Sequence, residues 1–335
     1  MNTEFIDAIF DRISQINALI IGDVMLDSYT FGDVNRISPE APVPVIDVTS
    51  RCNRLGGAAN VALNIKSLGA KPIICSVIGN ERQSLDFVQL MKDEGLLADG
   101  ILLSNERMLT VKHRIIGNKM QLLRIDEEVK HSLSPTEEAD FLILIKQIIA
   151  ANSIDVIIFE DYDKGIITEN IIEQVIDFAQ QNSIPVTVDP KKRNFLKYRN
   201  TDIFKPNLKE LKEGFGMLET EIDDMLLKEV IKKFMTEKNH KRLLLTLSAS
   251  GVLLCEQKGS EFIFEHIPAH LRTIADVSGA GDTVISVASM CLVLGMTSKE
   301  IAAFANLAGG LVCEEMGVAA IDKEKYAGEI AKMTH

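Results

Sequence analysis

The sequence predicts an α/β protein built on a doubly wound, mostly parallel sheet. Short apolar runs rich in β-branched residues alternate with longer amphipathic segments along the chain. Strands of this kind have no polar face, so helices must cover both faces of their sheet. The predicted strands are 18–24, 72–79, 154–161, 184–190, 201–207 and 241–248, and the predicted helices are 57–69, 81–94, 135–151, 168–182, 219–238, 279–296 and 298–316.

Two segments break the alternation and predict a small antiparallel β flap, or lid. Residues 29–50 and 107–125 have strand patterns with no helix between the strands, and the second segment folds back at Gly117-Asn118. A flap of this kind can close over a bound ligand, although a purely structural edge hairpin fits the pattern equally well. Because no low-complexity linker or internal repeat interrupts the chain, we expect residues 1–335 to form a single domain.

The composition of the 335 residues argues against several classes of protein. A net charge of -12 offers no basic stripe for nucleic acid. The N-terminus is acidic, unlike a secretory signal, and the longest apolar run is shorter than the roughly 20 residues that cross a bilayer. The five cysteines are scattered without a C-x-x-C pair, as in reduced intracellular proteins. We therefore expect a cytoplasmic protein without nucleic-acid or membrane partners.

The stretch "DVSGAGD" predicts an anion site at the head of a buried helix. Gly279, Ala280 and Gly281 let backbone N–H groups approach a ligand, and the positive end of the helix dipole faces it. Asp282, in the first turn, can accept a proton from a hydroxyl that attacks a phosphoryl group. Gly-rich turns before helices are also common without any ligand. The stretch is neither a Walker A loop nor G-x-G-x-x-G. No G-x-G-x-x-G follows "ALIIGD" at the first predicted strand, which counts against a nicotinamide dehydrogenase.

Five stretches, in chain order, resemble motifs of the ribokinase-like, or PfkB, carbohydrate kinases. They are "IGDVMLD", "LGGAANVALNIKSLG", "KPNLKE", "LTLSASG" and "DVSGAGD", and together they span nearly the whole chain. The resemblance implies a ribokinase-like fold and a sugar kinase that uses ATP and Mg²⁺. Each stretch alone also fits a structural role, such as close helix packing, a surface turn or a helix cap.

The resemblance implies a role for each matching residue. Asp282 would be the catalytic base, and Gly279, Ala280 and Gly281 would hold the developing charge. The sugar would contact Asp27, Asp23, Gly56, Gly57 and Asn60, with Asp23 the weaker candidate. The nucleotide would contact Asn207, Thr246, Ser248, Gly251 and Asn306. Glu210 would support Mg²⁺, directly or through water, and a monovalent cation would lie near Asp276 and Ser278. Ser248 stands where the family more often has glycine.

Other stretches are similar to bacterial D-glycero-D-manno-heptose 7-phosphate kinases. They are "NRISPEAPVPVIDV", "VKHRIIGNKMQLLRID", "DYDKG" and "VDPKKRNFLKYR". The resemblance implies phosphoryl transfer to the C1 hydroxyl, in the synthesis of ADP-heptose for lipopolysaccharide. Glu160 and Asp163 depart from the usual S-D-Y-G-K-G, which weakens the substrate assignment. Other PfkB acceptors (ribose, fructose, a nucleoside or another phosphosugar) and a catalytically silent sugar or nucleotide sensor stay open.

A phosphosugar needs a second anion subsite, which an acidic chain must supply locally. Lys191, Lys192 and Arg193 follow a buried strand, and Lys191 is the first candidate, although a solvated basic turn fits as well. The apolar face of the flap, with Val43, Val45 and Ile46, predicts a homodimer through the lid, which the resemblance also favours. In many bacteria the kinase that this chain resembles is fused to a nucleotidyltransferase with an H-x-G-H motif. No such motif occurs here, so we expect a stand-alone kinase and a separate nucleotidyltransferase.

Overall fold

The computed structural model describes residues 3–219, 221–270 and 272–333. Within these residues the main body is a nine-stranded sheet with the order β13-β12-β11-β10-β9-β8-β1-β4-β5. Its pairs are parallel from β11 to β5, and β12 and β13 add an antiparallel edge. The strands are β1 (Asn17–Gly22), β4 (Lys71–Ile78), β5 (Ile101–Leu103), β8 (Val156–Glu160), β9 (Val186–Asp189), β10 (Ile203–Phe204), β11 (Arg242–Thr246), β12 (Val252–Lys258) and β13 (Glu261–Ile267). The predicted α/β fold with a mostly parallel sheet is confirmed.

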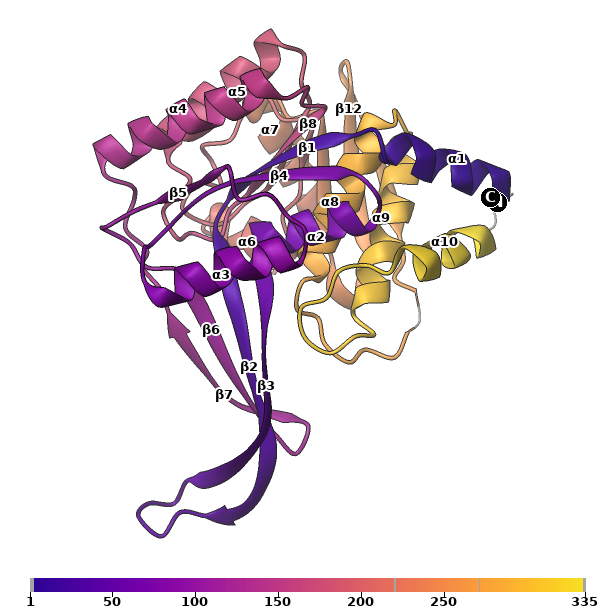
Figure 1. The fold of residues 1–335 in the computed structure, drawn as a ribbon. Helices are drawn as coiled ribbons and strands as arrows, with labels where there is room; N and C mark the ends of the chain where they lie inside the picture. The colour runs from indigo at the N-terminus through magenta and orange to yellow at the C-terminus, as the bar shows by residue number, and fades with distance from the viewer. Residues whose placement is uncertain (1–2, 220, 271, 334–335) are drawn as a thin grey trace.

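Helices cover both faces of this sheet (Figure 1). The strand side chains alternate between two buried clusters, so Ile20 packs in one and its neighbours Leu19 and Ile21 in the other. The first cluster includes α1 (Thr3–Ile13), α2 (Ala58–Ser67), α3 (Arg82–Asp93), α8 (Ala280–Val293), α9 (Ser298–Val312) and α10 (Lys323–Lys332), and the second α4 (Pro135–Ala151), α5 (Glu169–Gln181), α6 (Leu208–Gly214) and α7 (Asp224–Lys238). In the part of the chain described, none of the helices has the length and apolar character needed to span a membrane.

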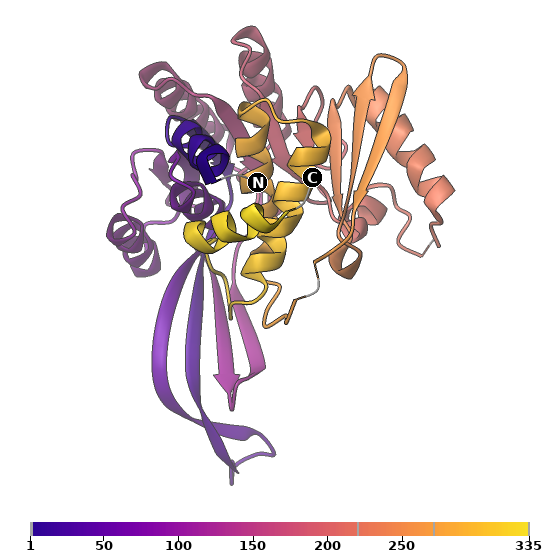
Figure 2. The ribbon, with the colours of Figure 1, turned by 90° about the vertical axis from the view of Figure 1, so that its right-hand side faces the viewer.

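A second, four-stranded sheet projects from one end of the body (Figures 1 and 2). It consists of β2 (Val24–Ile37), β3 (Pro44–Gly57), β6 (Thr110–Gly117) and β7 (Met120–Glu127). Two antiparallel hairpins join through a parallel pairing of β2 with β6, and the second hairpin turns at Asn118 and Lys119, both with positive φ. This is the predicted flap, with a longer first hairpin than residues 29–50. The strands β2 and β3 extend into the body because Val24 pairs with Gly57 there.

Several elements escape the sequence analysis. The helix α7 begins at Asp224, where Asp223 caps it, rather than near 219; Thr220, within the predicted range, lies outside the described residues. The terminal helices α1 and α10 were not predicted, and they pack together with Phe10 and Tyr326 edge to face at a centroid distance of 6.4 Å. The β12–β13 hairpin was also missed; β12 begins with a buried apolar run and ends in the polar residues 256–258.

Candidate active site

A cavity of about 1080 Å³ opens between the head of α8 and the carboxyl ends of β9, β10 and β11. Ligands bind at this edge of open α/β sheets, because the loops that follow the strands converge there. The cavity gathers residues that the sequence analysis selected from five separate parts of the chain. Those that line it are Lys191, Asn207, Glu210, Thr246, Ser248, Gly251, Gly279, Ala280, Gly281, Asp282 and Asn306.

The first turn of α8 is shaped by Gly279. This residue is the N-cap and adopts φ 82°, in the left-handed region that favours glycine. A Cβ at this position would lie 2.9 Å from the Nδ2 atom of Asn60. The turn carries no side-chain cap, which leaves its first N–H groups without a partner from a capping side chain, and Gly279, Ala280 and Gly281 line the cavity. The structure therefore places the predicted anion cradle at the wall of the cavity.

Asp282 is buried, with its carboxylate held from two sides. Asn60 Nδ2 donates to Asp282 Oδ2 at 2.7 Å, and the Tyr162 hydroxyl donates to Oδ1 at 2.7 Å. Burial raises the pKa of the Asp282 carboxyl to about 6, although both hydrogen bonds lower it. The carboxylate is thus fixed in orientation and more basic than a surface aspartate, as a general base requires.

Two buried lysines stand beside this helix end. Lys205 Nζ lies 2.7 Å from Asp189 Oδ2, and a Cβ on Gly281 would lie 3.4 Å from the same Nζ. Lys191 contacts Glu210 Oε1 and lies 3.6 Å from Asp189 Oδ1. Burial lowers the pKa of each lysine, but the carboxylates outweigh it and the net direction is upward, so both stay charged. Lys191 therefore lies beside Glu210, which is predicted for the nucleotide side of the site, and its contact with the sugar phosphate stays a prediction.

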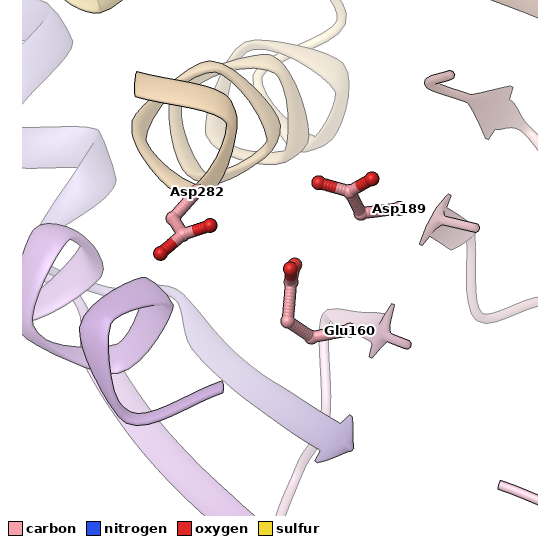
Figure 3. Close-up of side chains that lie close together, drawn as sticks. All are labelled: Glu160, Asp189 and Asp282. Atoms are coloured by element: carbon pink, nitrogen blue, oxygen red, sulfur yellow. The ribbon is translucent and has the colours of Figure 1, made fainter. Parts of the chain in front are cut away.

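Glu160 completes an acidic trio with Asp189 and Asp282 (Figure 3). One carboxylate oxygen from each residue lies within 4.8 Å of the others. Glu160 is fully buried, and burial, followed by the charges of Asp189 and Asp282, raises its pKa well above the ordinary value. These oxygens are hard donors of the kind that suit Mg²⁺.

The predicted nucleotide residues follow neighbouring strands at the cavity. Asn207 and Glu210 form a reciprocal cap at the start of α6, with both hydrogen bonds at 2.8 Å. Asn207 also forms a β-bridge with Thr246. Ser248 has φ 51°, which explains why glycine suits this position. The predicted adenine neighbour Asn306 donates to the carbonyl of Pro268 at 2.9 Å.

The predicted sugar residues lie at the root of the lid and do not line this cavity. Asp27 is buried on β2 and pairs with Arg114. Asp23 accepts hydrogen bonds from the backbone N–H groups of Tyr162 at 2.7 Å and Lys164 at 3.2 Å. The two glycines make close approaches, since a Cβ on Gly56 would lie 2.2 Å from Asp27 Oδ2, and one on Gly57 would lie 2.3 Å from the Asp23 carbonyl. Of these predicted sugar-binding residues, Asn60 is the one that hydrogen-bonds to Asp282.

The remaining predicted positions have local roles. Asp276 accepts from the N–H groups of Ser278 at 2.9 Å and Gly317 at 3.0 Å, which ties the loop before α8 to the loop after α9. Asp163 stands where the usual motif S-D-Y-G-K-G has glycine, and its φ of 57° lies in the left-handed region. Aspartate tolerates this region better than most residues, so the substitution is accommodated. On the lid, Val43 is exposed and Val45 and Ile46 are half-buried.

Sequence reasoning assigned no role to four residues of the site, namely Glu160, Tyr162, Asp189 and Lys205. A signal was present, because Glu160, Asp189 and Lys205 lie within two residues of the carboxyl ends of three predicted strands, where ligand-binding residues gather. What the sequence lacks is their mutual placement. Glu160 stands directly opposite Asp189 in the β8–β9 register, and adjacent positions in a parallel pair share a face.

Comparison with known proteins agrees with this geometry. A family model described as "pfkB family carbohydrate kinase" matches residues 16–325. The D-beta-D-heptose 7-phosphate kinase of Bordetella bronchiseptica is 35% identical over 319 residues, covering 95% of this chain and 97% of that protein. The bifunctional protein HldE of Citrifermentans bemidjiense is 35% identical over 332 residues, and the chain spans 98% of its own length but 66% of that relative. A crystal structure of Escherichia coli phosphofructokinase-2 with potassium has TM-score 0.74 and 18% identity, covering 95% of this chain and 99% of that one.

Proposed function

Since the chain belongs to the pfkB family of carbohydrate kinases, we propose that it transfers the γ-phosphoryl group of ATP to the C1 hydroxyl of D-glycero-D-manno-heptose 7-phosphate. The observation that carries the reaction type is the buried Asp282, oriented at the head of α8 beside the cavity. The kinase from Bordetella, matched over nearly its full length, supports the choice of acceptor. The product is the 1,7-bisphosphate.

Asp282 acts as the general base. Its carboxylate accepts the proton of the acceptor hydroxyl while that oxygen forms a bond to the γ-phosphorus and the bond to the ADP oxygen breaks. The hydrogen bonds from Asn60 and Tyr162 hold the carboxylate in one orientation. A pKa of about 6 keeps it ionised at neutral pH yet basic enough to take up the proton. Positioning and electrostatics then supply most of the rate enhancement.

The helix end stabilises the charge on the transferring group. The N–H groups of residues 279–281 point toward the phosphoryl oxygens, and the α8 dipole favours negative charge there. Lys205 adds an ammonium group beside Gly281. Because Lys205 is buried and anchored by Asp189, it is already in place before the reaction begins. Such preorganised donors cost no reorganisation in the transition state.

We place the nucleotide along the cavity wall formed by Thr246, Ser248, Gly251 and Asn306, with its phosphates toward Asn207 and the two lysines. When Mg²⁺ binds together with ATP, it neutralises part of the negative charge on the phosphates. The oxygens of the site fit such an ion, but Glu210 uses Oε2 for its helix cap and Oε1 for Lys191. Its support of the ion is therefore through water.

The acceptor would enter at the root of the lid, where Gly56 closely approaches Asp27 and Gly57 closely approaches Asp23. Closure of the lid would exclude water and protect ATP from hydrolysis. A homodimer through the exposed lid face, which includes Val43, is part of this proposal. We also place a monovalent cation near Asp276 and Ser278, an inference that the potassium complex of phosphofructokinase-2 supports.

The biological setting follows from the proposed reaction. Consumption of ATP supports a cytoplasmic location. A nucleotidyltransferase must act next to produce ADP-heptose, and we propose that a separate polypeptide carries it, as the kinase-only name of the Bordetella relative suggests. These assignments concern the pathway and do not change the chemistry at Asp282.

An acceptor panel tests the proposed function. ADP release is coupled to NADH oxidation with heptose 7-phosphate, ribose, fructose and fructose 6-phosphate as acceptors. We expect kcat/KM for heptose 7-phosphate to exceed the others by at least about 10², because a site that hydrogen-bonds particular groups of its substrate rejects analogues that lack or misplace them. A preference for another sugar would reassign the acceptor within the family. Absence of transfer to any acceptor, with ATP bound, would favour a silent sensor.

A further inference from the structure

We propose that Asp23 is a positioning residue for the catalytic base, because it fixes the two segments that supply the hydrogen-bond donors of Asp282. Those donors are Asn60, in the first turn of α2, and Tyr162, in the loop that follows β8. Asp23 is the residue between β1 and β2. The inference rests on the proposed role of Asp282 as the base.

The side chain of Asp23 holds the loop that carries Tyr162. Its Oδ2 atom accepts hydrogen bonds from the backbone N–H groups of Tyr162 at 2.7 Å and Lys164 at 3.2 Å. A carboxylate oxygen is a strong acceptor for backbone N–H groups. Arg107 binds the same loop, since its guanidinium donates to the carbonyl of Lys164. The backbone around Tyr162 is therefore fixed by two side chains that lie outside the loop.

The main chain of Asp23 holds the start of α2. Its carbonyl accepts from the N–H group of Ala58 at 3.0 Å. Because the N-cap Gly57 provides no side-chain cap, this carbonyl serves one of the first helical N–H groups, which lack partners within the helix. The N–H group of Asp23 donates to the carbonyl of Glu160 at 3.1 Å. One residue thus connects the end of β8, the loop after it and α2.

The alternative role of Asp23 is a direct contact with the acceptor sugar. Its Oδ1 atom has no hydrogen-bond partner among the described residues, which leaves an acceptor for a sugar hydroxyl. The residue is fully buried, however, and does not line the cavity at the head of α8. The two roles predict different kinetics. Loss of a sugar contact raises the KM for the acceptor, whereas loss of a positioning contact lowers kcat.

Asp23→Ala removes the carboxylate but keeps the backbone carbonyl, so it tests the contact with the Tyr162 loop. We expect kcat to fall by about 10- to 100-fold, because a misplacement of about 1 Å at an active site can cost 10²-fold in rate. The KM values for ATP and for the acceptor should change by less than about threefold. Asp23→Asn keeps an acceptor oxygen for the two N–H groups and should recover most of kcat.

A double-mutant cycle tests whether Asp23 acts through Tyr162. If it does, the double variant Asp23→Ala, Tyr162→Phe should have a kcat within about threefold of that of Tyr162→Phe, since residues that act through one another are not additive. A role in general packing would instead multiply the two single effects.

Nuclear magnetic resonance follows Tyr162 without any substrate. The chain has four tyrosines, so protein labelled with ¹³C at the tyrosine Cζ atoms gives few signals, and Tyr162→Phe identifies the signal of Tyr162. We expect this signal to shift in Asp23→Ala and to keep its native position in Asp23→Asn. The signals of Tyr29 and Tyr326 should stay where they are in both variants.

The matched control is Asp155→Ala. Asp155 immediately precedes β8, at the opposite end of that strand, and its Oδ2 atom accepts from the backbone N–H group of Asn17 at 2.8 Å. The control therefore also removes a hydrogen bond between a carboxylate and the backbone. Both kcat and the Tyr162 signal should remain native in it.

The proposal is overturned if the Tyr162 signal is unchanged in Asp23→Ala, if the KM for the acceptor rises while kcat is kept, or if the cycle is additive. Equal effects of Asp155→Ala would overturn it as well. Should Asp23→Ala fail to melt cooperatively, Asp23→Ser decides in its place, because its hydroxyl ends short of the carboxylate oxygens. If the native chain phosphorylates no acceptor, the proposed function fails, and the Tyr162 signal alone decides this inference.

Discussion

Asn60 Nδ2 and Asp282 Oδ2 lie 2.7 Å apart and join the first turn of α2 to the first turn of α8. The two residues are 222 positions apart in the chain. A second tie runs nearby, because Thr283 Oγ1 donates to Asn64 Oδ1 at 3.0 Å. The orientation of the proposed base is therefore set by the packing of two buried helices, not by a mobile loop.

Replacing Asn60 by alanine tests this relationship. Asn60→Ala removes a hydrogen bond to a charged group, worth about 1.5–3 kcal/mol, so we expect kcat to fall by about 10- to 100-fold. The KM for ATP should change little, because Asn60 does not line the nucleotide cavity. Steady-state kinetics of the variant, with a melting curve as control for folding, measure both effects. An unchanged kcat would remove the positioning role.

The Tyr162 hydroxyl should control the pH dependence of the reaction. Its hydrogen bond lowers the pKa of Asp282, against the larger effect of burial, which raises it to about 6. Activity requires the ionised carboxylate, so kcat/KM rises with pH through the pKa of Asp282. In Tyr162→Phe that pKa rises, and we expect the acid limb of the profile to move to higher pH. Profiles of kcat/KM for both proteins between pH 5 and 8 give the comparison; coincident limbs would contradict it.

The sequence predicts the fold and the head of α8 because those signals are local. Apolar runs such as 18–24 and 154–161 predict buried strands, and "DVSGAGD" predicts a turn in which Gly279 adopts a positive φ. The acidic trio is different. Its members are 29 and 93 residues apart along the chain, and their meeting depends on the β8–β9 register and on how α8 packs over it. The contact of Lys191 with Glu210 escaped the sequence analysis for the same reason, because Glu210 follows a later strand.

The buried pair of Lys205 and Asp189 should be essential for stability. Removing one partner leaves a buried charge uncompensated, so Lys205→Met should lower the free energy of unfolding by about 3–5 kcal/mol. An exposed pair provides the matched control. Lys233 lies 3.8 Å from Glu237 on the surface of α7, and Lys233→Met should cost less than about 1 kcal/mol. Urea unfolding of both variants measures the contrast, and equal losses would contradict it.

His240 should make the fold sensitive to acid. Burial lowers its pKa from 6.5 to about 3, and the ring is stacked on Phe204 at 4.7 Å between centroids. Between these pH values the unfolded chain binds a proton that the native state excludes. Stability therefore falls as pH drops from about 6.5 toward 3, by at most about 5 kcal/mol. His240→Asn should flatten this part of the stability curve in urea unfolding at pH 4 to 7; an equal slope would exclude His240 as the cause.

The central claim is that Asp282 takes the proton of the acceptor at the head of α8. Asp282→Asn keeps the shape of the side chain and both neighbours but cannot accept this proton. We predict that ATP binding, measured by calorimetry, stays within about threefold of the native value, while kcat with heptose 7-phosphate falls by about 10² to 10⁴. A variant that binds ATP normally and turns over at a rate near that of the native protein would contradict the account.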